Sequence, residues 1–218
     1  MIKSNFKNWS LAKAEETFGL DRVAALPSLT DWLAATSTND AEEMRTVTRL
    51  QTQLIEKVDG WNEAELSNRF INPLIDLVSI QSRYHGFFIE RPIKGIVGNY
   101  ELSGNVDAMI ASGYREPHKP FFCLSEYKKE GKAAGDAIGQ VLVEMMVAQS
   151  LNNDEQPIYG CYVLGRNWFF LTLEGKRYAK SLAFDSTKDD IHDILRILKG
   201  LKAIVERRVG ILTNSAGV

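Results

Sequence analysis

Apolar side chains recur every three or four residues along several stretches of the chain, and this spacing is typical of helices that bury one face. In the first such stretch the apolar positions are Met44, Val47, Leu50, Leu54 and Val58. Pro73 lies inside the second stretch, where we expect it to kink the helix or loosen the turn before it. The pattern predicts helices over residues 40–58, 62–78, 133–151 and 190–206.

Aromatic and β-branched residues dominate the segments between these helices, which indicates strands separated by Gly, Asn and Pro. The predicted strands cover residues 87–93, 100–111, 119–128, 158–165, 167–173 and part of 177–184. This order predicts an α/β (α+β) fold, in which a central mixed β-sheet is flanked by helices and follows an N-terminal helical segment. We expect residues 1–60 to form a helical extension packed on the core, residues 61–209 to form the main domain, and residues 210–218 to form a frayed tail.

Composition narrows the class of protein without identifying it. Of 218 residues, 44% are hydrophobic and 25% charged, which is typical of a globular chain. The net charge of -2 excludes a broadly basic protein that coats nucleic acid, although a basic cleft can exist within a neutral total. Cys123 and Cys161 lack metal-ligand spacing, and no signal sequence or membrane span is evident. We therefore expect a protein of the reducing cytoplasm that does not associate with membranes.

Three of the charged residues on two predicted strands can act together: Asp107, Glu126 and Lys128. Glu126 and Lys128 are two residues apart and therefore project from the same face of one strand, whereas Asp107 lies on the preceding strand. If these strands are neighbours, two carboxylates and an ammonium meet within a few ångströms. Carboxylate oxygens are suitable ligands for Mg²⁺, which can polarise a phosphoryl oxygen and acidify a bound water. A lysine beside them can orient that water and stabilise charge that develops on the phosphate.

These residues carry a resemblance to a known family. Asp107 followed by Glu126-Tyr127-Lys128 resembles the signature of the PD-(D/E)XK, or restriction-endonuclease-like, nuclease superfamily. Glu65, in ELSNRFINPLI, is similar to the acidic residue on the first core helix of that superfamily. Gln140, in GQVLVEMM, is similar to a glutamine that several branches place on the helix after the E-x-K strand. The position before Asp107 departs from the pattern, because it holds valine instead of proline.

The resemblance spans roughly residues 62–184 and implies cleavage of DNA with Mg²⁺ or Mn²⁺ by in-line attack of water. It implies that Asp107 and Glu126 hold the metal, that Glu65 supports the metal or the water, and that Gln140 supports the site. It also implies that Lys128 assists the nucleophile. The candidates for phosphate contacts are Lys129, Lys132 and Arg69. A homodimer would allow a chain of this size to cut both strands of DNA.

Each of these residues also has a structural explanation. Glu126 and Lys128 could form a solvent-facing pair on an edge strand, and Asp107 could form a turn after Gly104-Asn105. Asn62 and Glu65 have the spacing of a capping box, which would explain Glu65 without catalysis. Gln140 could face solvent. The alternative functions are a catalytically silent nuclease fold that binds nucleic acid or protein, and a structural protein with an unrelated mixed sheet.

Overall fold

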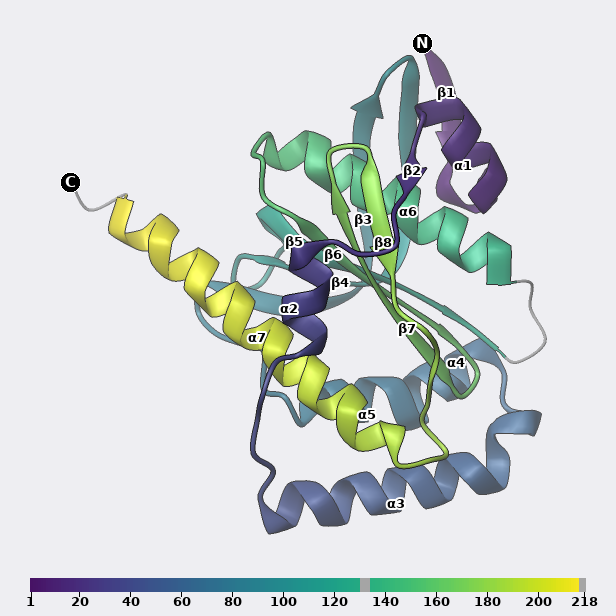
Figure 1. Cartoon of the computed structure of the whole chain (residues 1–218), viewed down its shortest axis with the longest axis vertical. Helices are drawn as coiled ribbons and strands as arrows, with labels where there is room; N and C mark the ends of the chain where they lie inside the picture. Colours follow the sequence, from purple (N-terminus) through teal and green to yellow (C-terminus); the bar gives the residue numbers. More distant parts are fainter. Residues whose placement is uncertain (130–133, 216–218) are drawn as a thin grey trace.

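The computed structural model describes residues 1–129 and 134–215, and the strands among them form one mixed nine-stranded sheet (Figure 1). The sheet order is β1-β4-β5-β6-β7-β8-β2, with β3 beside β4 and β9 beside β7. The strands are β1 (Ile2–Asn5), β2 (Asp21–Arg22), β3 (His85–Val97), β4 (Tyr100–Ser112), β5 (His118–Lys128), β6 (Ile158–Leu164), β7 (Asn167–Glu174), β8 (Arg177–Lys180) and β9 (Phe184–Asp185). Helices cover both faces, so the predicted fold class is confirmed.

The helices divide between the two faces and enclose two separate cores. One core lies between the sheet and α1 (Leu11–Phe18) and α6 (Ala134–Asn152). The other lies under α2 (Pro27–Leu33), α3 (Ala41–Lys57), α5 (Asn72–Asp76) and α7 (Asp190–Ser215). The remaining helical elements are η1 (Phe6–Asn8), η2 (Val58–Gly60), α4 (Glu63–Leu66) and η3 (Ser67–Ile71). None of the helices in the described ranges is long and apolar enough to cross a membrane.

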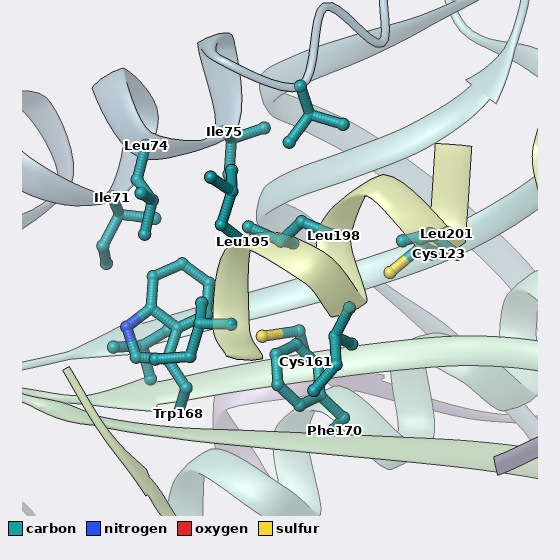
Figure 2. Close-up of a cluster of buried hydrophobic side chains, with 14 of the residues drawn as sticks. Ile71, Leu74, Ile75, Cys123, Cys161, Trp168, Phe170, Leu195, Leu198 and Leu201 are labelled. Carbon is teal, nitrogen blue, oxygen red and sulfur yellow. The ribbon is translucent and has the colours of Figure 1, made fainter. Parts of the chain in front are cut away.

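The core beneath α7 is built largely from aromatic residues of β7 and from apolar side chains of the helices. Figure 2 shows Trp168 and Phe170 of β7 close to Leu195 and Leu198 of α7. The cysteines of β5 and β6, Cys123 and Cys161, lie in the same cluster and are buried and free. Both cysteines therefore pack as small hydrophobic residues.

The predicted effect of Pro73 is visible in the helical segment that begins after Asn62. The segment is α-helical in α4, becomes a π-helical turn in η3 and returns to α-helix in α5. Proline has no N–H to donate and its ring crowds the preceding turn, so the regular hydrogen-bond ladder cannot continue through it. The loosened turn lies immediately before the proline, as the sequence predicts.

The two ends of the chain differ from the sequence prediction. We expected a helical extension over residues 1–60, but β1 pairs with β4 and β2 pairs with β8, both in parallel. These strands have four and two residues, which is too short for an alternating pattern to reveal them. At the other end, α7 continues to Ser215, beyond the point at Gly210 where we expected fraying.

Midway along the β3–β4 hairpin, the alternation of side chains between the two faces of the sheet shifts by one residue. This shift determines where Asp107 lies. Phe88 and Ile93 are five residues apart on β3, yet both are buried in the core beneath α6, although a regular strand would place them on opposite faces. Glu90, between them, has a left-handed φ of 50°. The pairs Ile89–Ala108 and Arg91–Val106 flank the irregularity, so Asp107 lies opposite Glu90. Asp107 is therefore at the point where the hairpin changes faces.

Candidate active site

Asp107 and Glu126 come together because β4 and β5 are antiparallel neighbours. The ladder pairs Ala108 with Ser125, and one further step places Asp107 opposite Glu126. The ladder ends there, and the Tyr127 N–H instead donates to Asp107 Oδ2 at 2.6 Å. This hydrogen bond fixes the Asp107 carboxylate beside the end of β5. The structure therefore brings together the two carboxylates that the strand pattern singled out, in place of an Asx turn at Asp107.

Glu126 is fully buried, and both oxygens of its carboxylate have partners. The Lys128 ammonium donates to Oε1, and the Gln140 amide of α6 donates to Oε2 at 2.7 Å. The side chain of Lys128 is 17% exposed, so this ion pair does not lie on a solvent-facing edge. Glu126, Lys128 and Gln140 thus form one hydrogen-bonded group behind Asp107.

Two polar residues of α6, Gln140 and Glu144, face inward, contrary to the alternative that Gln140 faces solvent. Gln140 Nε2 also donates to Glu144 Oε1 at 3.3 Å, and Glu144 is fully buried one helical turn further along. Its second oxygen, Oε2, has no hydrogen-bond partner among the described residues. Burial, and then the charge of Glu126, raise the pKa of Glu144 well above its usual range.

Burial and mutual repulsion also disfavour ionisation of the two central carboxylates. Burial raises the pKa of Asp107, and the hydrogen bond from the Tyr127 N–H and the charge of Lys128 only partly oppose this. Burial, and then the charge of Asp107, raise the pKa of Glu126 to about 7. Burial works against the charge on Lys128, but the Glu126 carboxylate outweighs it and raises the lysine pKa. The site therefore has an excess of negative charge that a bound cation would relieve.

Glu65 occupies a different position from the one the resemblance implies. Its carboxylate accepts a hydrogen bond from the Asn62 N–H at 3.1 Å and completes the capping box of α4. It also pairs with Arg69 at 3.5 Å, and the Arg69 side chain is half exposed. The capping alternative thus describes Glu65. The nearby acidic residue whose charge acts on both Asp107 and Glu126 is Glu63.

A small pocket opens over Asp107. It has a volume of about 240 Å³ and is lined by Glu63, Ala64, Ser67, Ile89, Glu90, Asp107 and Tyr127. A larger hollow of about 970 Å³ lies along α7, where Lys199 pairs with Glu43 at 2.7 Å and Arg208 with Asp154 at 3.8 Å. The smaller pocket is lined by three acidic residues, Asp107, Glu63 and Glu90.

One phosphate-contact candidate, Lys129, lies at the end of β5. Lys129 follows β5 directly and is exposed. Lys132 falls outside the described residues. With Arg69 paired to Glu65, Lys129 is the candidate of this group that the structure places beside the Glu126–Lys128 strand.

Comparisons with known proteins add little to this geometry. No family model matches the chain, and no curated protein matches it. One similar solved structure is titled "cryoEM structure DrdV-DNA complex", with 12% sequence identity and a TM-score of 0.47. The match covers 75% of this chain but only 14% of that protein's chain.

The donor chemistry at Asp107 and Glu126 fits a divalent cation, although no third ligand converges with them. Among the described residues, no three His, Cys, Asp or Glu side chains are arranged to hold a metal ion. The two carboxylates nevertheless supply hard oxygen atoms. Burial raises the pKa of both, and the charge of Asp107 raises that of Glu126 further. Mg²⁺ commonly uses only one or two protein carboxylates and keeps several waters.

Sequence reasoning missed two acidic residues, although signals for both were present. The capping-box spacing of Asn62 and Glu65 already tied Glu65 to the helix end, which left Glu63 as the free acid of the first turn. Glu144 is four residues after Gln140 and therefore shares its helical face. Once Gln140 faces Glu126, Glu144 must be buried as well.

The raised pKa of Glu126 predicts a pH dependence of stability in the metal-free protein. Its folded-state value of about 7 exceeds the ordinary value of 4.5, so the folded chain retains a proton that the unfolded chain releases. The stabilisation is complete below pH 4.5 and declines as pH rises to about 7, with a slope of at most about 1.4 kcal/mol per pH unit. Urea unfolding between pH 5 and 8 measures this slope.

The matched control for this measurement is Glu126→Gln. His85 adds an opposite slope in the same range, because burial lowers its pKa and the unfolded chain then binds the extra proton. The difference between wild type and Glu126→Gln removes this contribution, since His85 is present in both. Identical pH profiles for the two proteins would contradict the assignment.

Proposed function

We propose that this protein is a metal-dependent nuclease that hydrolyses phosphodiester bonds of DNA. The observation that carries the proposal is the meeting of Asp107 with Glu126 and Lys128 at the point where β4 and β5 separate. Two acidic groups and a lysine in this arrangement suit attack of water on a phosphate, as the resemblance to PD-(D/E)XK nucleases implies.

Asp107 and Glu126 would hold the cation, with Mg²⁺ or Mn²⁺ as the candidates. When bound, the cation would polarise the phosphoryl oxygen and lower the pKa of a bound water. Lys128 is close enough to Glu126 to stabilise negative charge on the phosphate and to orient the attacking water. Gln140 holds the Glu126 carboxylate in place through its amide. Glu63, at the mouth of the pocket, takes the supporting role that the resemblance gave to Glu65.

A second candidate function is a catalytically silent protein of the same fold that binds nucleic acid. One observation favours it: Lys128 and Gln140 already satisfy both oxygens of Glu126, and no third metal ligand converges among the described residues. In such a protein the internal ion pair would replace the metal. A metal titration distinguishes the two functions, because only the nuclease binds Mg²⁺ with a rise in melting temperature.

The proposal is tested by incubating the purified protein with supercoiled plasmid and single-stranded DNA, with Mg²⁺ or Mn²⁺ or with a chelator. We expect cleavage only with metal. Lys128→Ala should slow it about 100-fold, because a charge beside the reacting phosphate is lost. The matched control is Lys129→Ala, which removes an exposed lysine one residue away and should reduce the rate no more than a few-fold. Absence of metal-dependent cleavage, or equal rates for Lys128→Ala and wild type, would contradict the proposal.

A further inference from the structure

The pairing of β1 with β4 brings the N-terminal segment close to the proposed site. β3 occupies one edge of β4 along its whole length, so β1 and β5 share the other edge. β1 is parallel to β4 and its pairing ends at Asn5 with Ser103, whereas the β5 pairing begins at Ala108. The η1 turn therefore follows β1 into the interval between them, which is the stretch of β4 that leads to Asp107.

Two glycines allow the segment to dock closely on the core. A Cβ at Gly104 of β4 would lie 2.7 Å from the ring of Phe6, and one at Gly139 of α6 would lie 2.3 Å from the backbone carbon of Ser10. Both distances are shorter than real Cβ contacts. At each glycine, the neighbouring residue therefore occupies the space that a side chain would need. The chain is thus held against β4 before the turn and against α6 after it.

Side chains on both sides of the turn fix its conformation. Phe6 and Trp9 are buried, and the Trp9 ring contacts those of Phe18 and Tyr100 with centroids 4.9 and 5.2 Å apart. Asn5 caps the turn by accepting a hydrogen bond from the backbone N–H of Lys7 at 3.0 Å. The Lys7 side chain, between these anchors, is exposed and forms no ion pair with any residue that the structure describes.

The position of Lys7 distinguishes it from the other lysines of the segment. The turn that carries it packs against β4 at Gly104, which is three residues before Asp107. By contrast, the Lys3 ammonium faces Glu101 at 3.9 Å, and Lys13 donates to Asn8 O at 3.0 Å and lies over the Trp9 ring. Lys7 is therefore an exposed cation on a docked turn, next to the stretch of β4 that leads to Asp107, and its ammonium is available to an anion.

We propose that the turn at Lys7 forms one wall of the DNA-binding cleft, and that the Lys7 ammonium binds a backbone phosphate adjacent to the one held at Asp107. This inference rests on the proposed function, because it names the residue outside the helix–strand core that holds the substrate. A lysine binds phosphate as a compact point charge, and each such contact releases counterions from DNA. The N-terminal segment thereby becomes part of the substrate site.

The test measures binding of a fluorescein-labelled 20-base-pair DNA duplex to the full chain at several salt concentrations, with a chelator present so that no cleavage occurs. Loss of one phosphate contact should reduce the slope of log K against log[salt] by about 0.9. We expect Lys7→Gln to show this change and to bind several-fold more weakly, Lys7→Glu to bind more weakly still, and Lys7→Arg to bind as wild type does. Lys3→Gln, on the same segment, is the matched control and should leave the slope unchanged.

The outcomes separate this inference from the proposed function. If wild type cleaves DNA with metal but Lys7→Gln and Lys3→Gln have the same salt slope as wild type, the inference is overturned and the proposed function stands. If wild type neither binds nor cleaves DNA, both fail. A reduced slope for Lys7→Gln with an unchanged slope for Lys3→Gln supports the Lys7 contact whether or not cleavage is observed.

Discussion

Replacing Asp107 with asparagine is expected to slow metal-dependent DNA cleavage by about 10³-fold, on the order of 4 kcal/mol of transition-state stabilisation. The amide oxygen of asparagine can still accept the hydrogen bond from the Tyr127 N–H, so the end of β5 should keep its position. The change removes a charge without removing a contact. A gel-based cleavage assay at saturating Mg²⁺, with the rates of wild type and Asp107→Asn compared, measures the effect.

The same substitution should preserve or raise the stability of the metal-free protein. Asp107 raises the pKa of Glu126 through repulsion, so its neutral replacement relieves the buried pair. Asp76→Asn is the control, since Asp76 is an exposed residue at the end of α5 and should affect neither rate nor stability. Cleavage by Asp107→Asn at the wild-type rate would exclude Asp107 as a metal ligand. A large fall in its melting temperature would show that the carboxylate serves the fold instead.

Substituting alanine for Gly139 should destabilise the protein by about 3 kcal/mol and detach the N-terminal segment. The added methyl would lie 2.3 Å from the Ser10 carbon and 2.5 Å from the Leu11 nitrogen, and both are backbone atoms that no rotamer change can move. This clash outweighs the gain of about 1 kcal/mol that alanine normally brings to a helix. Urea unfolding measures the loss, and limited proteolysis detects the release of residues near the N-terminus.

The control for this substitution is Gly210→Ala. Gly210 is also in a helix, but a Cβ there would meet no atom of the described residues within 4 Å, so stability should be unchanged or slightly higher. Gly139→Ala should also weaken DNA binding as Lys7→Gln does, and combining the two should add little, because both remove the same contact. A stable Gly139→Ala protein with a protected N-terminus would show that α1 is not held at this point.

The sequence predicted the longer helices and strands, whose residue patterns extend over many positions. Seventeen residues of α3 give a clear helical pattern, and strands β3 to β7 are rich in aromatic and β-branched residues. The structure contains these elements within a few residues of the predicted bounds. The meeting of Asp107 with Glu126 followed from the same reasoning, because alternation fixed the face of Glu126 and chain order made β4 and β5 neighbours. β1 is too short to show such a pattern, and its pairing with β4 joins residues that are far apart in the sequence.

The positions of Glu65 and Glu90 have local physical causes. Glu65 matched a family pattern, but its carboxylate is bound to the end of its own helix, and the choice between Glu63 and Glu65 depends on which way a single helical turn faces. The left-handed residue at Glu90 was also invisible in the sequence, since glutamate does not favour that conformation. Its conformation comes from the packing of two cores, which no single segment encodes.

The change of face at Glu90 has a further consequence for how accurately the hairpin folds. In an ordinary hairpin a slip of two residues restores the pattern of inward and outward side chains, so that such errors are only weakly penalised. Here β3 and β4 each change faces once, and the two changes coincide only when Ile89 pairs with Ala108. Any slip, even or odd, would place residues of one core on the face of the other. The irregular hairpin thus selects a single register, and every correctly folded molecule has Asp107 at the same position opposite Glu126.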